Sequence, residues 1–265
     1  MWPSGGRHLW ASGETSAAQS HDRGHLVYAA SGVLAVNTER GTSIVPADRV
    51  AWTPAGFTHH HRAHGETDMR IVFLAPSIAR FLPDDPAVFL ASGLAREVLL
   101  ALTGPRNYGD AASGYSRAAQ ARLLRVLVDE LREAYEEPLH LPQPRDDRLQ
   151  AIARILYETP ADDSTLGELG KAIGASTRTL SRLFRSEFGM TFYEWRTQLR
   201  ICHALVLLAD GHDTVRTAHA CGWASPSAFI AAFTKIMGTT PGRHRVGALG
   251  HRPPFPAPAA PVASE

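Results

Sequence analysis

The spacing of hydrophobic positions changes about a third of the way along the chain. Before residue 84, apolar residues come in short runs, such as His25–Tyr28, Gly32–Val36 and Met69–Leu74. Turn-forming residues separate the runs, for example Ser31-Gly32, Pro54-Ala-Gly56 and His64-Gly65. Short runs punctuated in this way are typical of antiparallel strands. Residues 1–84 are therefore predicted to form an antiparallel sandwich or barrel.

Helical spacing replaces this pattern further on. Ala87–Leu102 and Tyr115–Tyr135 are predicted helices, the second with apolar residues three and four positions apart. This second helix either packs on its own domain or joins two chains in a dimer, and its sequence fits both. Three prolines follow within 138–144, which favours an extended linker. We therefore divide the chain into a barrel (1–84), a helical dimerisation or packing segment (85–137), a linker (138–145), a helical module (146–246) and a disordered Pro/Ala-rich tail (247–265).

The helical module contains a diverged internal repeat. Each copy has a short predicted helix, a glycine suited to a tight turn, a serine suited to capping, a second helix with two apolar residues four positions apart, and a closing glycine. The paired positions are Gly174 and Gly222, Ser176 and Ser225, Leu180 and Phe229, Phe184 and Phe233, and Gly189 and Gly238. A long predicted helix, Tyr193–Leu208, connects the copies. The predicted fold is thus a multidomain α+β protein whose C-terminal all-α module has two helix-turn-helix units.

The second copy carries a longer pattern. Gly222-Trp-Ala-Ser-Pro-Ser-Ala-Phe, followed by Phe233, Lys235, Gly238, Pro241 and Arg245, resembles the signature of AraC/XylS-type transcription regulators. The resemblance covers about eighty residues, and its many fixed points make it far more specific than a single turn motif. It implies a bacterial regulator in the cytoplasm that binds double-stranded DNA, acts with RNA polymerase and can form a homodimer.

On this resemblance, the first recognition helix runs from about Thr177 to Ser186, and its outward residues are Arg178, Ser181, Arg182 and Arg185. Arginine can donate two hydrogen bonds to guanine O6 and N7, so Arg178 and Arg182 are the candidate base contacts. Arg185, late in the helix, suits a phosphate at least as well as a base.

The second recognition helix has a weaker reading face. Ser225 and Ser227 can bind phosphate at a helix N-terminus, and Lys235 can contact the backbone or be structural. Ile230 and Ala231 offer only apolar contact. We therefore expect the first unit to specify sequence and the second mainly to anchor.

Six of the 13 histidines lie between positions 21 and 64. Gln19, His21 and His25, with Pro54-Ala-Gly-Phe-Thr-His59, resemble the two motifs of a cupin barrel, which implies that Gln19, His21, His25 and His59 face its interior. Three imidazoles are enough to bind a divalent transition metal. The alternatives are a metal-free pocket for a small-molecule effector and histidines that only pack together. Strand alternation would put His61 on the same side as His59 and His60 on the opposite side. We nevertheless expect His60, His61 and His64 at the surface, and an additional metal role is the alternative.

Charge and composition add modest support. The net charge is +1, but residues 164–245 have ten basic and five acidic residues, whereas residues 1–145 have fourteen and fifteen. A basic module beside a neutral one fits a DNA-binding domain with a sensor. Two cysteines, Cys202 and Cys221, predict no disulfide framework, and no segment resembles a signal peptide or a membrane span.

Two other functions fit parts of the chain. A metal-dependent cupin enzyme would explain the histidines but would not need the helical module. A structural DNA-binding protein would leave the barrel without a role. We therefore expect a regulator, not an enzyme, that is controlled by a small molecule or a metal.

Overall fold

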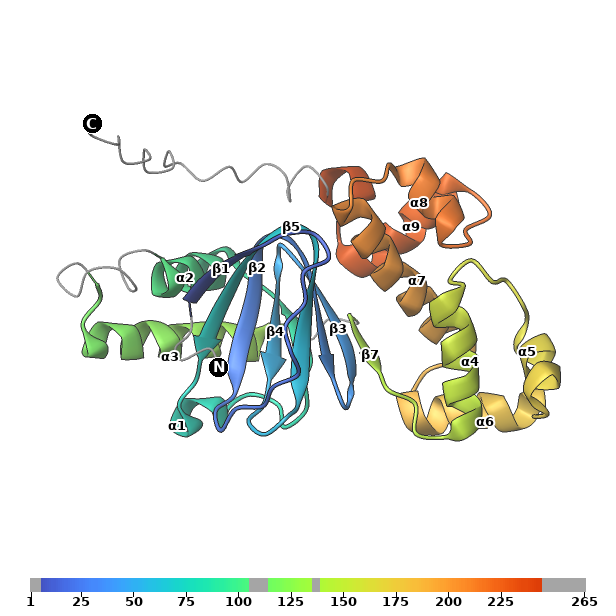
Figure 1. The fold of residues 1–265 in the computed structure, drawn as a ribbon, viewed down its shortest axis with the longest axis horizontal. Helices are drawn as coiled ribbons and strands as arrows, with labels where there is room; N and C mark the ends of the chain where they lie inside the picture. The colour runs from blue at the N-terminus through green and yellow to red at the C-terminus, as the bar shows by residue number, and fades with distance from the viewer. Residues whose placement is uncertain (1–5, 105–113, 135–138, 245–265) are drawn as a thin grey trace, which may run out of the picture.

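The computed structural model describes residues 6–104, 114–134 and 139–244. An antiparallel sheet occupies the N-terminal part and a helical region the C-terminal part (Figure 1). The tail predicted to be disordered, residues 247–265, lies outside the described residues, as does Arg245.

The described strands form one seven-stranded sheet in which every pairing is antiparallel. Its main path is β1-β5-β2-β3-β7, and β4 joins β2 to β6. The strands are β1 (Gly6–Trp10), β2 (His25–Thr38), β3 (Gly41–Pro46), β4 (Arg49–Thr53), β5 (His59–Phe73), β6 (Ala87–Leu90) and β7 (His140–Pro142). The short hydrophobic runs of the sequence thus become an antiparallel sheet, as predicted.

Two strands are longer than predicted. Ser31-Gly32 and His64-Gly65, expected to be turns, lie inside β2 and β5, where the pairing shifts register on both sides of Ser31. Gly32 and Gly65 have φ of +76° and +69°, so each glycine allows the backbone to bend without ending the strand. Glycine pairs that predict turns from the sequence therefore form irregularities within long strands here.

Alternation along β2 separates two cores. Leu34 and Val36 face the interior of the sheet region, and Val33 and Ala35 face the helical region. Packing on two sides explains why this strand is buried along most of its length.

Helices cover another face of the sheet. After the short α1 (Pro76–Ala79), α2 (Gly93–Thr103) and α3 (Arg117–Glu133) pack against β2 and β4 (Figure 1). The predicted helix from Ala87 begins later than expected, because residues 87–90 form β6 on the free edge of β4. Leu127, Val128 and Leu131 bury one face of α3 against its own domain. Its opposite face carries the exposed Val126.

The helical region surrounds one long central helix. Its elements are α4 (Asp147–Glu158), α5 (Leu166–Ile173), α6 (Thr177–Phe188), α7 (Phe192–Ala209), α8 (Thr214–Ala220) and α9 (Pro226–Met237). Trp195, Leu199 and Leu205 of α7 are buried in a core that contains residues from every one of these helices. The same core reaches Ile44 of β3 and Leu141 of β7.

The two regions also meet through polar contacts. Gly65 N donates a hydrogen bond of 3.0 Å to Asp210 Oδ1, just after α7, and Gln198 Nε2 on α7 donates one of 2.9 Å to His140 O. Arg49, 2% exposed, donates a 3.5 Å hydrogen bond to a backbone carbonyl in the last turn of α9. The predicted linker thus contains β7, which pairs with β3, and the helical region rests directly on the sheet.

Candidate nucleic-acid interface and histidine cluster

The first helix pair, α5 and α6, is defined by local signals. Thr165 and Glu168 form a capping box at the start of α5, and Gly174, with φ of +70°, ends that helix in the left-handed conformation. Ser176 then caps α6 by accepting a 3.2 Å hydrogen bond from Thr179 N. The turn between the helices is therefore set by capping at both ends.

The two faces of α6 differ sharply. Leu180 and Phe184 are 0% and 1% exposed and anchor the helix in the core. The predicted outward residues Arg178, Ser181, Arg182 and Arg185 are all exposed, in positions that repeat every three or four residues. Within the described residues, the three arginine side chains make no ion pair or hydrogen bond. Among the residues that the structure describes, this face presents guanidinium groups without ion-pair partners to solvent.

The second pair, α8 and α9, repeats the arrangement with other residues. Ser225 caps α9 by accepting a 3.2 Å hydrogen bond from Ala228 N, and Phe229 and Phe233 are buried. Ser227 and Lys235 are exposed as predicted, whereas Ser225 is only half-exposed. As far as the described chain shows, the outer face of α9 therefore has the unbonded hydroxyl of Ser227 near its start and the cation of Lys235 near its end.

The basic ends of the two pairs lie around the start of α7. Hydrogen bonds from Thr191 hold the pKa of the Glu194 carboxyl below its usual value, and the positive charges of Arg185 and Lys235 lower it further. These two cations, from α6 and α9, thus act on the same carboxylate. Arg178 and Arg182 are nearer the start of α6.

A second group of predicted residues lies inside the sheet region. His25 and His59 are 1% and 2% exposed, and their ring centroids are 4.6 Å apart. His61, expected at the surface, is 0% exposed and lies 5.2 Å from His59 between ring centroids. The surface expectation for His61 is wrong because β5 continues through this segment, so alternation turns His59 and His61 inward and leaves His60 exposed.

The other two predicted interior residues occupy the edge of this cluster. His21 is partly exposed, with its ring centroid 5.1 Å from His59 and 5.5 Å from His25. Gln19 pairs with His59 through backbone hydrogen bonds of 2.8 and 2.9 Å. His25, His59 and His61 can each offer a nitrogen within 4.8 Å of the other two. The side chains that lie close enough to bind one ion are therefore His25, His59 and His61. Of the predicted interior residues, Gln19 and His21 are not in this set, and His61 is added to it.

Burial keeps these imidazoles neutral. Desolvation lowers the pKa of His25 and His59, and that of His61 to about 3. Only neutral imidazole has the lone pair that a metal ion or a hydrogen-bond donor needs.

Comparison with known proteins decides the family. Residues 169–246 match the model of a helix-turn-helix domain. The chain is 31% identical to the HTH-type transcriptional regulator NimR of Escherichia coli over an alignment of 230 residues. The alignment covers 87% of this chain and 82% of NimR.

The chain belongs to the AraC family of transcription regulators. The arabinose operon regulatory protein of Escherichia coli is 28% identical over 53% of this chain and 48% of its own length. RipA of Corynebacterium glutamicum is 38% identical over 44% of this chain and 36% of its own. These relatives are regulators, so this AraC-family chain is not an enzyme, as the sequence predicts.

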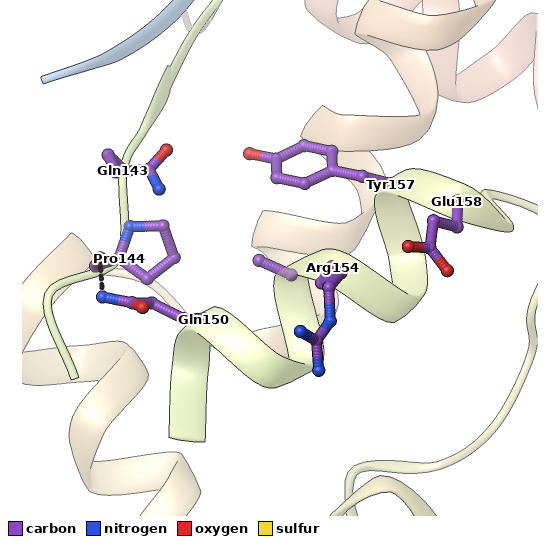
Figure 2. Close-up of a pocket in the computed structure, with 7 residues that line it drawn as sticks. Gln143, Pro144, Gln150, Arg154, Tyr157 and Glu158 are labelled. Carbon is purple, nitrogen blue, oxygen red and sulfur yellow. Dashed lines mark hydrogen bonds between the residues drawn. The ribbon is translucent and has the colours of Figure 1, made fainter. Parts of the chain in front are cut away.

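This regulator also has a pocket whose lining includes neither the predicted DNA-contacting residues of α6 and α9 nor the histidine cluster. It has a volume of about 320 Å³ and lies between residues 143–144 and α4. Figure 2 shows Tyr157 and Gln143 on opposite sides, with Gln150 closing one end through a 3.1 Å hydrogen bond to Pro144 O. Burial raises the pKa of Tyr157 to about 12, so its phenol stays protonated.

Among the described residues of this AraC-family chain, no helix is long and apolar enough to cross a membrane.

Proposed function

We propose that this AraC-family chain binds specific DNA sequences through two helix-turn-helix units, the pairs α5–α6 and α8–α9. The observation that carries the proposal is the face of α6, where exposed Arg178, Arg182 and Arg185 lie opposite the buried Leu180 and Phe184. A helix anchored on one face and basic on the other can enter the major groove. The two units would then occupy successive grooves, about 34 Å apart.

The two units divide the work. On α6, Arg178 and Arg182 read bases, Ser181 supports them, and Arg185 binds base or phosphate. On α9, Ser227 and Lys235 bind phosphate. Ser225 contributes there mainly as the helix cap, because its oxygen already accepts a backbone hydrogen bond. Phosphate contacts position a protein on DNA and base contacts specify the sequence, so α6 carries specificity and α9 anchors.

The sheet region acts as the sensor. We propose that it is a cupin-like barrel that binds a small-molecule or metal effector, and that α3 serves dimer formation through its exposed face. Direct packing of α7 against β2, β3 and β5 gives a bound effector a route to the DNA-binding helices. The regulator would act in the cytoplasm, at promoters, together with RNA polymerase.

Selection of binding sites from a randomised DNA library tests the division of labour. Arg182→Ala should change the selected base at one position, with a loss of about 1–3 kcal/mol of discrimination. Ser227→Ala should weaken binding to all sequences alike. Arg80→Ala, which also removes an exposed arginine but lies on the sheet region outside α3, should change neither. The proposal fails if the serine change alters base preference more than the arginine change does.

A further inference from the structure

Buried ring nitrogens without partners gather at one point of the sheet region. Within the described residues, neither ring nitrogen of His25 or of His61 has a hydrogen-bond partner, and the same holds for His59 Nε2. Buried polar atoms in folded proteins nearly always have a partner, and a group of orphaned atoms calls for an explanation such as a bound ion. Packing alone does not explain five such atoms on three neighbouring rings.

The orientation of His59 adds a second observation. Its Nδ1 lies 3.0 Å from Phe57 O, and since a carbonyl can only accept, Nδ1 carries the proton and donates it. Nε2 is then the lone-pair nitrogen, and it is the buried nitrogen without a hydrogen-bond partner. Metal-binding histidines are held in this way, with the far nitrogen hydrogen-bonded to a backbone carbonyl or a carboxylate.

We propose that His25, His59 and His61 form a binding site for one divalent transition-metal ion, and that this ion is the effector of the regulator. Imidazole ligands favour ions such as Zn²⁺, Ni²⁺, Cu²⁺ and Fe²⁺ over Mg²⁺ and Ca²⁺. Bonds of about 2.0–2.1 Å bring three ligand nitrogens to about 3.4 Å of one another, so small ring rotations from the present spacing suffice. His21, on the partly exposed side, is the fourth ligand or the neighbour of a bound water.

The site is connected to the helical region by one strand. His59 and His61 lie near the start of β5, and Gly65 of the same strand bonds to Asp210 at the end of α7. His25 begins β2, so an ion would join the starts of β2 and β5 across the interior. A bound ion would fix the position of His61 on β5, and Gly65, four residues further along this strand, contacts the end of α7. This second half of the inference rests on the proposed function.

Titration of the full-length protein with Co²⁺ tests the site. Co²⁺ replaces Zn²⁺ in tetrahedral sites and absorbs visible light there, so wild type should show visible absorption that saturates at one ion per chain and disappears when Zn²⁺ is added. His61→Ala and the more conservative His61→Gln should weaken binding at least about ten-fold. The matched control is His60→Ala, which removes the exposed neighbouring imidazole and should change binding less than two-fold.

The outcomes separate the site from the proposed function. Absence of saturable Co²⁺ absorption in folded wild type, or an equal loss in His60→Ala, would overturn the metal site. A DNA shift assay then compares Zn²⁺-loaded with chelator-treated protein, and a change in affinity of three-fold or more supports regulation. Equal DNA affinity in both states overturns metal regulation but leaves the proposed function intact. Absence of DNA binding in both states, despite bound metal, overturns the proposed function and with it the effector role, but leaves the metal site standing.

Discussion

Gly65 offers a sharp test of the contact between the sheet and α7. This glycine has φ of +69°, and a Cβ added there would lie 2.7 Å from Ala209 O, a backbone atom at the end of α7. Gly65→Ala therefore combines two penalties, a strained backbone and a collision that forces the two regions apart. Gly174 has φ of +70° but open space around an added Cβ, so Gly174→Ala carries the strain alone.

The difference between the two variants isolates the interface. A left-handed backbone costs a non-glycine residue about 1–2 kcal/mol, and overpacking adds about 1–3 kcal/mol, so Gly65→Ala should cost about 2–5 kcal/mol in total. At about 3 °C per kcal/mol for a chain of this size, Tm should fall by about 6–15 °C for Gly65→Ala and about 3–6 °C for Gly174→Ala.

Thermal unfolding followed by far-UV circular dichroism measures both variants beside wild type. Equal losses in Tm would show that nothing rigid faces Gly65. In that case the sheet and α7 do not pack as described, and the proposed route from sensor to DNA-binding helices is refuted.

Three further outcomes follow from buried groups. Burial raises the pKa of Cys202 and of Cys221 to about 12, so neither thiol should react with a disulfide reagent at pH 8 until the protein is unfolded. Burial lowers the pKa of His140 and of His244 in the folded protein, so these side chains take up protons on unfolding below about pH 6.5. Tm should therefore be lower at pH 5.5 than at pH 7.5, and an equal Tm at the two pH values would contradict this. Arg49→Met removes the buried cation that pairs with Asp48 at 2.6 Å and bonds to the carbonyl of Met237 at the end of α9. It should cost about 1.5–3 kcal/mol in urea unfolding, whereas a cost near zero would show that these contacts together are unimportant.

Much of the helical region could be predicted because its signals are local. Ser176 and Gly174 lie next to the helix ends that they define, and the buried Leu180 and Phe184 are one helical turn apart. Exposure of Arg178 and Arg182 follows from the same periodicity. Pattern and structure agree wherever neighbours in sequence decide the conformation.

The histidine cluster depended on long-range packing, and the sequence identified only part of it. His61 is buried because β5 pairs with β2 on one side while residues 15–19 cover it through bridges to Arg62 and His59. A run of three histidines before His64-Gly65 has no apolar alternation to mark a strand, so the surface was preferred for His61 although alternation placed it on the side of His59. Counting alternate positions from His59 was the one available signal.

Binding of the full chain to a selected DNA site at several salt concentrations, followed by fluorescence anisotropy, tests the central claim most directly. Each phosphate neutralised by an exposed cation releases counterions, so the logarithm of the binding constant should fall linearly with the logarithm of salt concentration, by about 0.9 per phosphate contacted. Arg185→Ala should reduce that slope if it binds phosphate. Affinity that does not depend on salt, or no preference for the selected site over random DNA, would contradict the account.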